Sequence, residues 1–355
     1  MSNFSPLPVI KGRGSQINPS NPFESNDRSS IIINEVFDDE DMNIKTRVVE
    51  SKASSIVNKV DSIDVPMGWS MNPYQGCEHG CVYCYARNSH NYWGYSSGLD
   101  FESNIVVKTN AAELLEKKLK SKNWEAAPIM VSGNTDCYQP IERHYKITRQ
   151  LLKCFLKYKH PVGLITKNKL MLRDLDILEE LNKDNLVSVA VSINTLDDDF
   201  RQKLEPRTSS IPNRLALIEK LRSKNIPVTA LCAPMIPGLN EHEIIPLVQK
   251  LSDLKVNGIG HIVLRLNGSI GSIFENWLDL HYPDRKEKVL NKVKDMHGGQ
   301  LNDSRFIMRM KGEGRIADII HKQFKVAQKR FHTPVPFSFN LELFEKRKNP
   351  QLSLF

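Results

Sequence analysis

Three cysteines in a span of eight residues are the strongest chemical signal in this chain. They read Cys77-x3-Cys81-x2-Cys84, and glycines stand at positions 76 and 80. In a reducing compartment such a cluster holds metal rather than forming a disulfide framework. Cubane iron–sulfur clusters usually take four thiolates. Three thiolates would therefore leave one iron with an open position that a substrate or cofactor can occupy.

Zinc is the alternative metal for these thiols. A tetrahedral zinc site would be completed by His79, Cys137 or a more distant residue. Such sites usually carry a second Cys/His pair at a recognisable spacing, and this sequence has none. We therefore favour an iron–sulfur cluster and expect His79 to be exposed and without a role. Cys154 and Cys232 stand in apolar surroundings, as buried packing residues do.

The elements that must position the cysteines are short apolar runs separated by amphipathic segments. Runs that are apolar throughout indicate strands covered on both faces, as in a parallel sheet. The predicted strands are 129–131, 162–165, 187–191, 228–231 and 259–266, and the predicted helices are 111–122, 142–157, 170–182, 212–224 and 241–255. Repeated strand–helix units close into an α/β barrel. About six units favour a partial (β/α)6 barrel.

Composition changes along the chain predict four regions. Residues 1–65 are rich in Ser, Asn, Asp and Pro, which indicates an N-terminal extension that is disordered or loosely attached on the main domain. Residues 66–270 form the α/β core. Residues 271–345 form a helical region, with helices predicted over 272–280, 284–296 and 315–330. Residues 346–355 form a tail.

The overall composition is that of a globular protein. Hydrophobic residues make up 40% and charged residues 25% of 355 residues, which argues against disorder throughout. No apolar run approaches the roughly 18 to 20 residues that span a bilayer. Residues 1–13 lack the pattern of a secretory signal. We therefore expect a cytoplasmic protein with no membrane partner.

The positive charge is concentrated near the C-terminus. The net charge is +8, and residues 281–355 hold 16 Lys and Arg against 8 Asp and Glu, which accounts for all of it. A locally basic region is the footprint of a polyanionic partner, most often nucleic acid. The same charge also fits a solvated helical surface.

Several motifs in order give the chain a family resemblance. The cysteine loop, with Tyr83 before its last cysteine, resembles the signature of radical S-adenosylmethionine (SAM) enzymes, over roughly residues 66–270. More narrowly, the chain resembles the spore photoproduct lyase-like, DNA-repair photolyase-related branch. The matching stretches are 135–140, 165–167, 192–194, 204–210 and 233–238.

This resemblance implies the cofactors and the chemistry. It implies a [4Fe-4S] cluster held by Cys77, Cys81 and Cys84, with SAM chelating the unique iron. Reduction of the cluster would cleave SAM and release a 5′-deoxyadenosyl radical, which takes hydrogen from the substrate. An electron donor such as flavodoxin or ferredoxin would be required. The barrel would exclude water and hold the substrate close to the radical.

The ends of the predicted strands supply candidates for binding SAM. Gly133, Asn134 and Asp136 end the second barrel strand and would meet the SAM amino group. Lys167 and Arg207 are the cations for the carboxylate. The remaining candidates are Ser192 and Asn194, for the ribose, and Tyr83, beside the cofactor pocket. Asn, Asp and Ser at strand ends are also common turn formers and helix caps.

The hydrogen donor differs from that of the family. Spore photoproduct lyases use a cysteine to return hydrogen to the product radical, and that position corresponds to Gly133 here. Cys137 at the mouth of the same strand is the expected substitute. Tyr85, beside the last cluster cysteine, is the expected relay. Thymine-dimer reversal itself is therefore not predicted.

The last five residues form a separate motif. Gln351-Leu352-Ser353-Leu354-Phe355 resembles the peptide by which bacterial repair and replication proteins bind the DNA polymerase sliding clamp. Leu352, Leu354 and Phe355 would supply the apolar contacts, with the last two as anchors, while Gln351 fixes the register. The alternative is a tail that folds back on its own domain.

Three functional hypotheses remain after these observations. The first is a radical SAM enzyme that acts on nucleic acid, with DNA as its partner. The second keeps the radical chemistry but directs it at a protein or a small molecule. The third is a zinc-stabilised, non-catalytic nucleic-acid-binding module.

Overall fold

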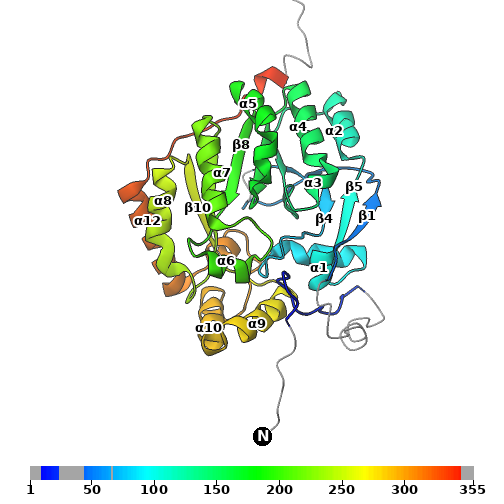
Figure 1. Ribbon diagram of the computed structural model, residues 1–355. Coiled ribbons are helices and arrows are strands. Elements are labelled where there is room, and N and C mark those ends of the chain that lie inside the picture. The colour runs from blue at the N-terminus through cyan, green and yellow to red at the C-terminus, as the bar shows by residue number, and fades with distance from the viewer. Residues whose placement is uncertain (1–8, 24–43, 65–66, 345–355) are drawn as a thin grey trace, which may run out of the picture.

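A seven-stranded sheet forms the centre of the molecule (Figure 1). The computed structural model describes residues 9–23, 44–64 and 67–344. The strands are β2 (Val57–Lys59), β3 (Trp69–Met71), β6 (Ile129–Val131), β7 (Val162–Thr166), β8 (Val187–Ser192), β9 (Val228–Met235) and β10 (Gly258–Val263). Their order is β10-β9-β8-β7-β6-β3-β2, and all neighbours are parallel except β2, which runs antiparallel to β3. Six parallel strands in an open row confirm the predicted partial barrel.

The strands form because their side chains are apolar on both faces. Leu164 of β7 pairs with Val189 of β8, and both are buried. Helices cover the outer face of the sheet, as Figure 1 shows for α4, α5 and α7. The covering helices are α2 (Ala111–Lys120), α4 (Ile147–Tyr158), α5 (Leu175–Lys183), α7 (Ile211–Ser223) and α8 (Ile244–Asp253). Every predicted strand and helix of the core is thus present.

Three predicted helices are divided in two. The segment 170–182 forms a 3-10 helix (Lys169–Asp174) followed by α5, and the segment 241–255 forms a 3-10 helix (Glu241–Glu243) followed by α8. The segment predicted as a helix over 142–157 forms α3 (Glu142–Tyr145) and α4, because Lys146 between them adopts a left-handed conformation with φ 53°. The buried Glu142 carboxylate accepts a hydrogen bond from the Thr148 backbone N–H in the first turn of α4, at 3.1 Å. An acceptor at this end satisfies one of the N–H groups that a helix start leaves unpaired.

The described part of the N-terminal extension lies on the main domain. β1 (Arg47–Ser51) pairs in parallel with β5 (Asn104–Lys108), which also pairs with β4 (Tyr74–Gln75) in a separate three-stranded sheet. β2 adds an edge strand to the main sheet. The sequences of β1 and β2 contain no long apolar run. These two strands therefore form through pairing with β5 and β3 rather than through a local apolar pattern.

Helices dominate after β10, as predicted. They are α9 (Ile270–His281), α10 (Lys286–Met296), α11 (Met308–Lys311) and α12 (Gly314–Phe331). Apolar residues of α9 and α10 form a second core with Phe200 and Leu204 of α6 (Asp198–Leu204). The domain boundary at residue 271 stays a prediction, and the tail residues Gln351 to Phe355 lie outside the described residues. Across the described ranges, no helix is long and apolar enough to cross a membrane.

Candidate active site

The cysteine loop follows β4 and is wrapped tightly by its neighbours. All three thiols are free; Cys77 and Cys81 are buried, and Cys84 is half-buried. Gly76 and Gly80 adopt left-handed conformations, with φ 77° and 69°. A Cβ atom on Gly80 would lie 2.8 Å from the Glu102 carboxylate. Glycine is therefore required at this position by conformation and by space.

The donor set of the loop fits the expected cluster. Burial raises the pKa values of the Cys81 and Cys84 thiols. These thiols therefore lose their protons readily only when a metal binds to the sulfur atoms. Within the described ranges, no three His, Cys, Asp or Glu side chains are arranged to hold a single metal ion. Three sulfur donors on one loop, two buried and one half-buried, are of the ligand type that an iron–sulfur cluster requires.

An ion pair that sequence analysis missed supports the loop. Arg87 and Glu102 pair at 2.5 Å with neither side chain exposed, and Arg87 Nε donates to the Cys81 carbonyl at 2.9 Å. The Glu102 carboxylate also accepts the backbone N–H groups of Gly14 and Ser15, at 2.9 and 2.8 Å. The cysteine loop, α1 (Leu99–Ser103) and the N-terminal segment thereby share one buried anchor. No local pattern in the sequence marks this pair, because its members stand 15 residues apart and the Gly14 and Ser15 backbone comes from a distant segment.

His79 is buried, so the expectation that it would be exposed is wrong. Only 1% of His79 is exposed, and its Nδ1 lies 3.3 Å from Asp136 Oδ2. Although burial opposes its charge, the neighbouring Asp136 carboxylate and Cys77 thiol raise the pKa of His79 to about 9. The signal available in the sequence was the position of His79 between Cys77 and Cys81, because a tightly wrapped loop buries the side chains between its cysteines.

Asp136 is held by the protein itself. Its Oδ1 accepts bonds from Thr166 Oγ1 and the Tyr138 N–H, both at 2.8 Å, and its Oδ2 accepts one from the Lys167 N–H at 2.8 Å. Although burial favours the neutral acid, His79 and the backbone donors lower the pKa of Asp136 to about 2. The carboxylate thus joins the loops after β6 and β7 and fixes the backbone of Lys167.

The loop after β6 brings Gly133 and Asn134 to the same side as the cysteine loop. Asn72 Oδ1 accepts hydrogen bonds from both backbone N–H groups, at 2.8 and 2.7 Å. The Tyr85 hydroxyl donates to the Gly133 carbonyl. A Cβ atom on Gly133 would lie in ordinary van der Waals contact with Asn72 and Ser70, at 3.7 Å. Asn72 is a positioning residue that sequence analysis missed, although it stands close to the cysteines.

Lys167, Tyr83 and the two later cysteines are brought together. Burial opposes the charge on Lys167, but the Cys81, Cys84 and Glu205 groups raise its pKa. Its Nζ lies 5.9 Å from the centroid of the Tyr83 ring. The Tyr83 hydroxyl donates to Glu205, which is ion-paired with Arg214; neither Glu205 nor Arg214 is exposed. In the sequence, Glu205 stood out only as a member of the matching stretch 204–210, without a role of its own.

Asn194 carries an unsatisfied buried amide. Ser192 ends β8, Asn194 stands two residues after it, and both are buried. Within the described part of the chain, neither the nitrogen nor the oxygen of the Asn194 amide has a hydrogen-bond partner. Buried polar groups nearly always have partners, and an exception indicates a missing ligand or water. The site therefore fits a polar cofactor beside this residue.

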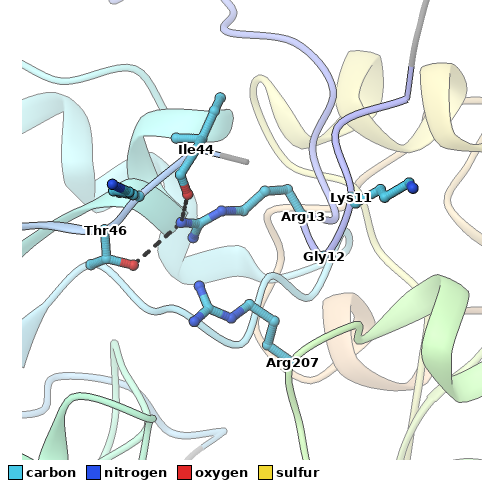
Figure 2. Close-up of a pocket in the computed structure, with 7 residues that line it drawn as sticks. Lys11, Gly12, Arg13, Ile44, Thr46 and Arg207 are labelled. Carbon is cyan, nitrogen blue, oxygen red and sulfur yellow. Dashed lines mark hydrogen bonds between the residues drawn. The ribbon is translucent and has the colours of Figure 1, made fainter. Parts of the chain in front are cut away.

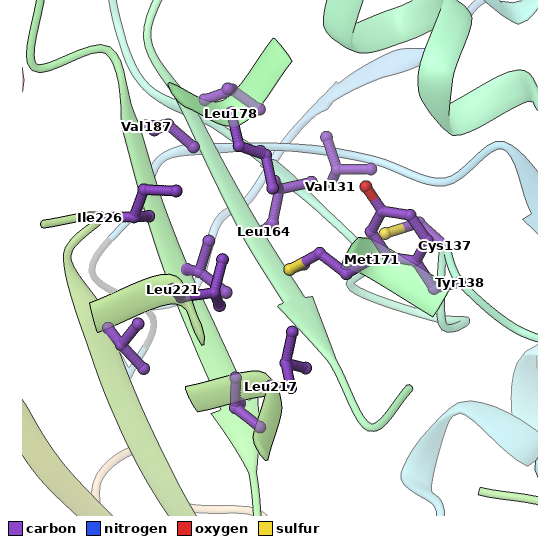
Figure 3. Packing of buried hydrophobic residues seen from close by; sticks show 14 of the residues in the cluster. Val131, Cys137, Tyr138, Leu164, Met171, Leu178, Val187, Leu217, Leu221 and Ile226 are labelled. Atoms are coloured by element: carbon purple, nitrogen blue, oxygen red, sulfur yellow. The ribbon is translucent and has the colours of Figure 1, made fainter. Parts of the chain in front are cut away.

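Three other candidates stand in different surroundings. Arg207 lies 3.4 Å from Glu78 and lines a pocket with Arg13 (Figure 2). Cys137 does not stand at the mouth of β6: it is fully buried in the apolar core, beside Tyr138 and Met171 (Figure 3). The expectation that Cys137 would stand at the mouth of the strand is therefore wrong, because its side chain packs into the main apolar core. Tyr85 is 50% exposed.

Comparisons with known proteins agree with this geometry. The family model of the radical SAM superfamily matches residues 71–251. An uncharacterized protein of Mycobacterium bovis is 31% identical over 238 residues, covering 66% of this chain and 70% of that protein. The radical SAM Nalpha-GlyT isomerase of Pseudomonas phage M6 is 29% identical over 197 residues, covering 54% of this chain and 38% of that protein.

A solved structure shares the fold. A mutant of spore photoproduct lyase aligns with a TM-score of 0.60 and 16% identity, covering 81% of this chain and 80% of that chain. At this identity the likeness shows the fold alone. The family match spans half of the chain and includes the three cysteines and the parallel strands β6, β7, β8 and β9. The chain therefore belongs to the radical SAM superfamily, whose enzymes use a [4Fe-4S] cluster and SAM.

Proposed function

We propose that this enzyme acts on nucleic acid. When bound, the reduced cluster and SAM supply a 5′-deoxyadenosyl radical that takes a hydrogen atom from the substrate. The chain's own residues bind SAM, hold the substrate and exclude water. In relatives, the names spore photoproduct lyase and Nalpha-GlyT isomerase describe a lyase and an isomerase, so the final product stays open.

The observation that carries the substrate class is a cationic and aromatic surface beside the last cysteine. Tyr85 directly follows Cys84 and is half exposed, and the Arg265 guanidinium lies 5.7 Å from the centroid of its ring. Arg265 follows β10 and makes no ion pair with any described residue. Aromatic rings combined with arginine bind unpaired bases through stacking and bind phosphates through charge.

An exposed apolar segment extends this surface. Phe306, Ile307 and Met308, hereafter the apolar tip, are 47%, 44% and 38% exposed. The Arg309 guanidinium lies 4.7 Å from the Phe306 ring centroid and pairs with Asp64. Burial and then the like charge of Arg309 lower the pKa of Arg265, so the two guanidinium groups are neighbours. Proteins that bind nucleic acid commonly combine apolar side chains with arginines in this way.

The residues around the cysteine loop supply the proposed SAM site. Lys167 binds the SAM carboxylate, because it is the cation beside Cys81 and Cys84. Ser192 and the unpaired amide of Asn194 bind the ribose. The loop of Gly133 and Asn134 receives the amino group. Tyr83 forms a wall of the pocket, and Asp136 positions Lys167.

The proposal also concerns the partners and the return of hydrogen. Tyr85 is the proposed relay, since it directly follows Cys84 and its hydroxyl donates to the Gly133 carbonyl after β6. DNA is the proposed nucleic acid, and flavodoxin or ferredoxin is the proposed electron donor. The sliding clamp is the proposed partner of the tail, whose residues lie outside the described ranges.

The test uses the anaerobically purified, cluster-loaded protein with a chemical reductant and SAM. Lesion-bearing and undamaged oligonucleotides are added separately, and 5′-deoxyadenosine is measured with deuterium-labelled oligonucleotide as the hydrogen source. Deuterium in 5′-deoxyadenosine supports a nucleic-acid substrate. SAM cleavage without deuterium transfer from any oligonucleotide, but with transfer from a peptide or metabolite pool, contradicts it.

A further inference from the structure

A basic pocket lies outside the SAM site, between the N-terminal segment and the turn after α6. Its volume is about 250 Å³. It is lined by Lys11, Gly12, Arg13, Ile44, Lys45, Thr46 and Arg207. Figure 2 shows the Arg13 and Arg207 side chains at this pocket, extending in the same direction. Four of the lining side chains are cationic and none is acidic.

Arg13 carries a buried charge that its hydrogen bonds do not neutralise. Only 6% of Arg13 is exposed. Its guanidinium donates to the carbonyls of Glu102 and Ile44, at 2.5 and 2.6 Å, and to Thr46 Oγ1 at 3.3 Å. All three acceptors are uncharged. Burial and then the charge of Arg207 lower the pKa of Arg13, so the two guanidinium groups repel each other across the pocket.

The nearest carboxylates are already engaged. Glu102 is paired with Arg87. Glu78 accepts hydrogen bonds from Thr46 Oγ1 and the Ile141 N–H, at 2.8 and 2.7 Å, and lies 3.4 Å from Arg207. Lys11 and Lys45 are exposed and make no ion pair within the described ranges. The pocket therefore keeps an excess of positive charge, which an anion can neutralise.

The walls of the pocket are held in place before any ligand binds. The Arg207 backbone N–H donates to the His79 carbonyl at 3.2 Å, which ties one wall to the cysteine loop. Gly12 has a left-handed conformation, with φ 72°, and the turn there carries Lys11 and Arg13 on either side. Arginines in a fixed orientation bind oxyanions with less loss of side-chain freedom than flexible lysines do.

We propose that this pocket binds a phosphate group. A tetrahedral oxyanion accepts several charge-assisted hydrogen bonds at once, and arginine's planar fork matches two of its oxygens. The phosphate belongs either to a nucleic-acid backbone or to free phosphate or a mononucleotide. This proposal is independent of the nucleic-acid substrate proposed above. Binding of free phosphate in the pocket would support it whichever substrate the enzyme uses.

The test measures binding to the cluster-loaded full chain at low ionic strength. The probes are inorganic phosphate, thymidine monophosphate and a single-stranded oligothymidylate, titrated by calorimetry and followed by phosphorus NMR. The test variant is Lys11→Gln with Lys45→Gln, which removes two exposed charges. The matched control is Lys117→Gln with Lys220→Gln, which removes two exposed charges from α2 and α7. Arg207→Gln is a third variant that removes one fixed wall.

We expect the test variant and Arg207→Gln to bind phosphate at least tenfold more weakly than the control does. If oligothymidylate binding falls in parallel, the bound group is a backbone phosphodiester. If only phosphate or the monophosphate is affected, the pocket takes a small phosphate compound. Equal phosphate binding in test and control variants, or none in the unaltered protein, overturns the proposal. Neither result bears on deuterium transfer from oligonucleotides, so the two proposals fail separately.

Discussion

Arg87 and Glu102 form an ion pair from which solvent is wholly excluded. Arg87 stands three residues after the last cysteine and also donates to the Cys81 carbonyl. Glu102 also holds the backbone of Gly14 and Ser15. This pair therefore couples the position of the cysteine loop to the docking of the N-terminal segment.

Removing one member of this pair should destabilise the fold. Glu102→Ala leaves a buried guanidinium without its partner, so we expect a loss of about 3 to 5 kcal/mol in the free energy of unfolding. Chemical denaturation of the purified protein measures this loss. The control is Glu113→Ala, at an exposed position of α2, which should change stability by less than about 0.5 kcal/mol. A Glu102→Ala protein as stable as the control would show that the pair contributes nothing.

The three loop cysteines should be equivalent ligands. Cys77→Ala, Cys81→Ala and Cys84→Ala should each abolish the visible absorption of the cluster and all SAM cleavage, because each removes one of the three thiolates that hold the cluster. Cys154→Ala and Cys232→Ala should keep the cluster and lose about 1 kcal/mol of packing energy or somewhat more. Iron content and absorption spectra of anaerobically purified proteins distinguish these outcomes. Full iron in Cys77→Ala would refute the ligand set.

Replacing Asn194 should raise the stability of the SAM-free protein and lower its affinity for SAM. Its unpaired buried amide costs folding energy, so Asn194→Ala should stabilise the SAM-free protein by about 1 kcal/mol. If the amide binds SAM, the same change should weaken SAM binding about tenfold, or about 1.4 kcal/mol. Denaturation and calorimetric titration measure the two effects.

The matched control for this prediction is Asn240→Ala. The Asn240 amide is also buried, but it donates to the Asn194 carbonyl at 2.8 Å and accepts from the Ile236 N–H at 2.7 Å. Its removal should destabilise the protein. A stabilised Asn194→Ala protein with unchanged SAM affinity would mean that water, rather than SAM, fills the place beside the amide.

The apolar tip should contribute to nucleic-acid binding. Stacking between an aromatic ring and a base contributes about 1 to 3 kcal/mol, so Phe306→Ala should weaken the binding of single-stranded DNA by that amount. Fluorescence anisotropy with a labelled oligonucleotide measures it. Val326→Ala, at an exposed apolar position of α12, is the control and should have no effect. Should both variants bind DNA like the unaltered protein, the tip is not part of the substrate surface.

The tail should bind a partner without affecting the chemistry. Burial of Leu354 and Phe355 in a groove offers about 3 to 6 kcal/mol before the cost of ordering the tail. Deletion of residues 351–355 should abolish binding to the sliding clamp in a calorimetric titration and leave SAM cleavage unchanged. A deletion variant that unfolds or loses its cluster would instead identify the tail as a structural element.

The sequence by itself determined the metal-binding loop and the architecture of the core. Cys77, Cys81 and Cys84 are close in the chain, so their spacing alone defines a ligand set. The apolar runs from 129 to 263 predicted the strands because burial on both faces leaves a local record in composition. The order of these strand–helix units then favoured a partial barrel.

Only the tertiary structure decided which polar residues face the site. Cys137 and Asp136 are adjacent, yet one is buried in the apolar core and the other bonds to His79 and to the loop after β7. The Arg87–Glu102 pair and the pocket around Arg13 unite segments that lie far apart in the chain. Contacts of this kind depend on how elements pack in space, and the packing of distant side chains leaves no periodic pattern in a single sequence. For this reason local spacing identified the cysteines, while the partners of His79, Asp136, Arg87 and Arg207 emerged only from the fold.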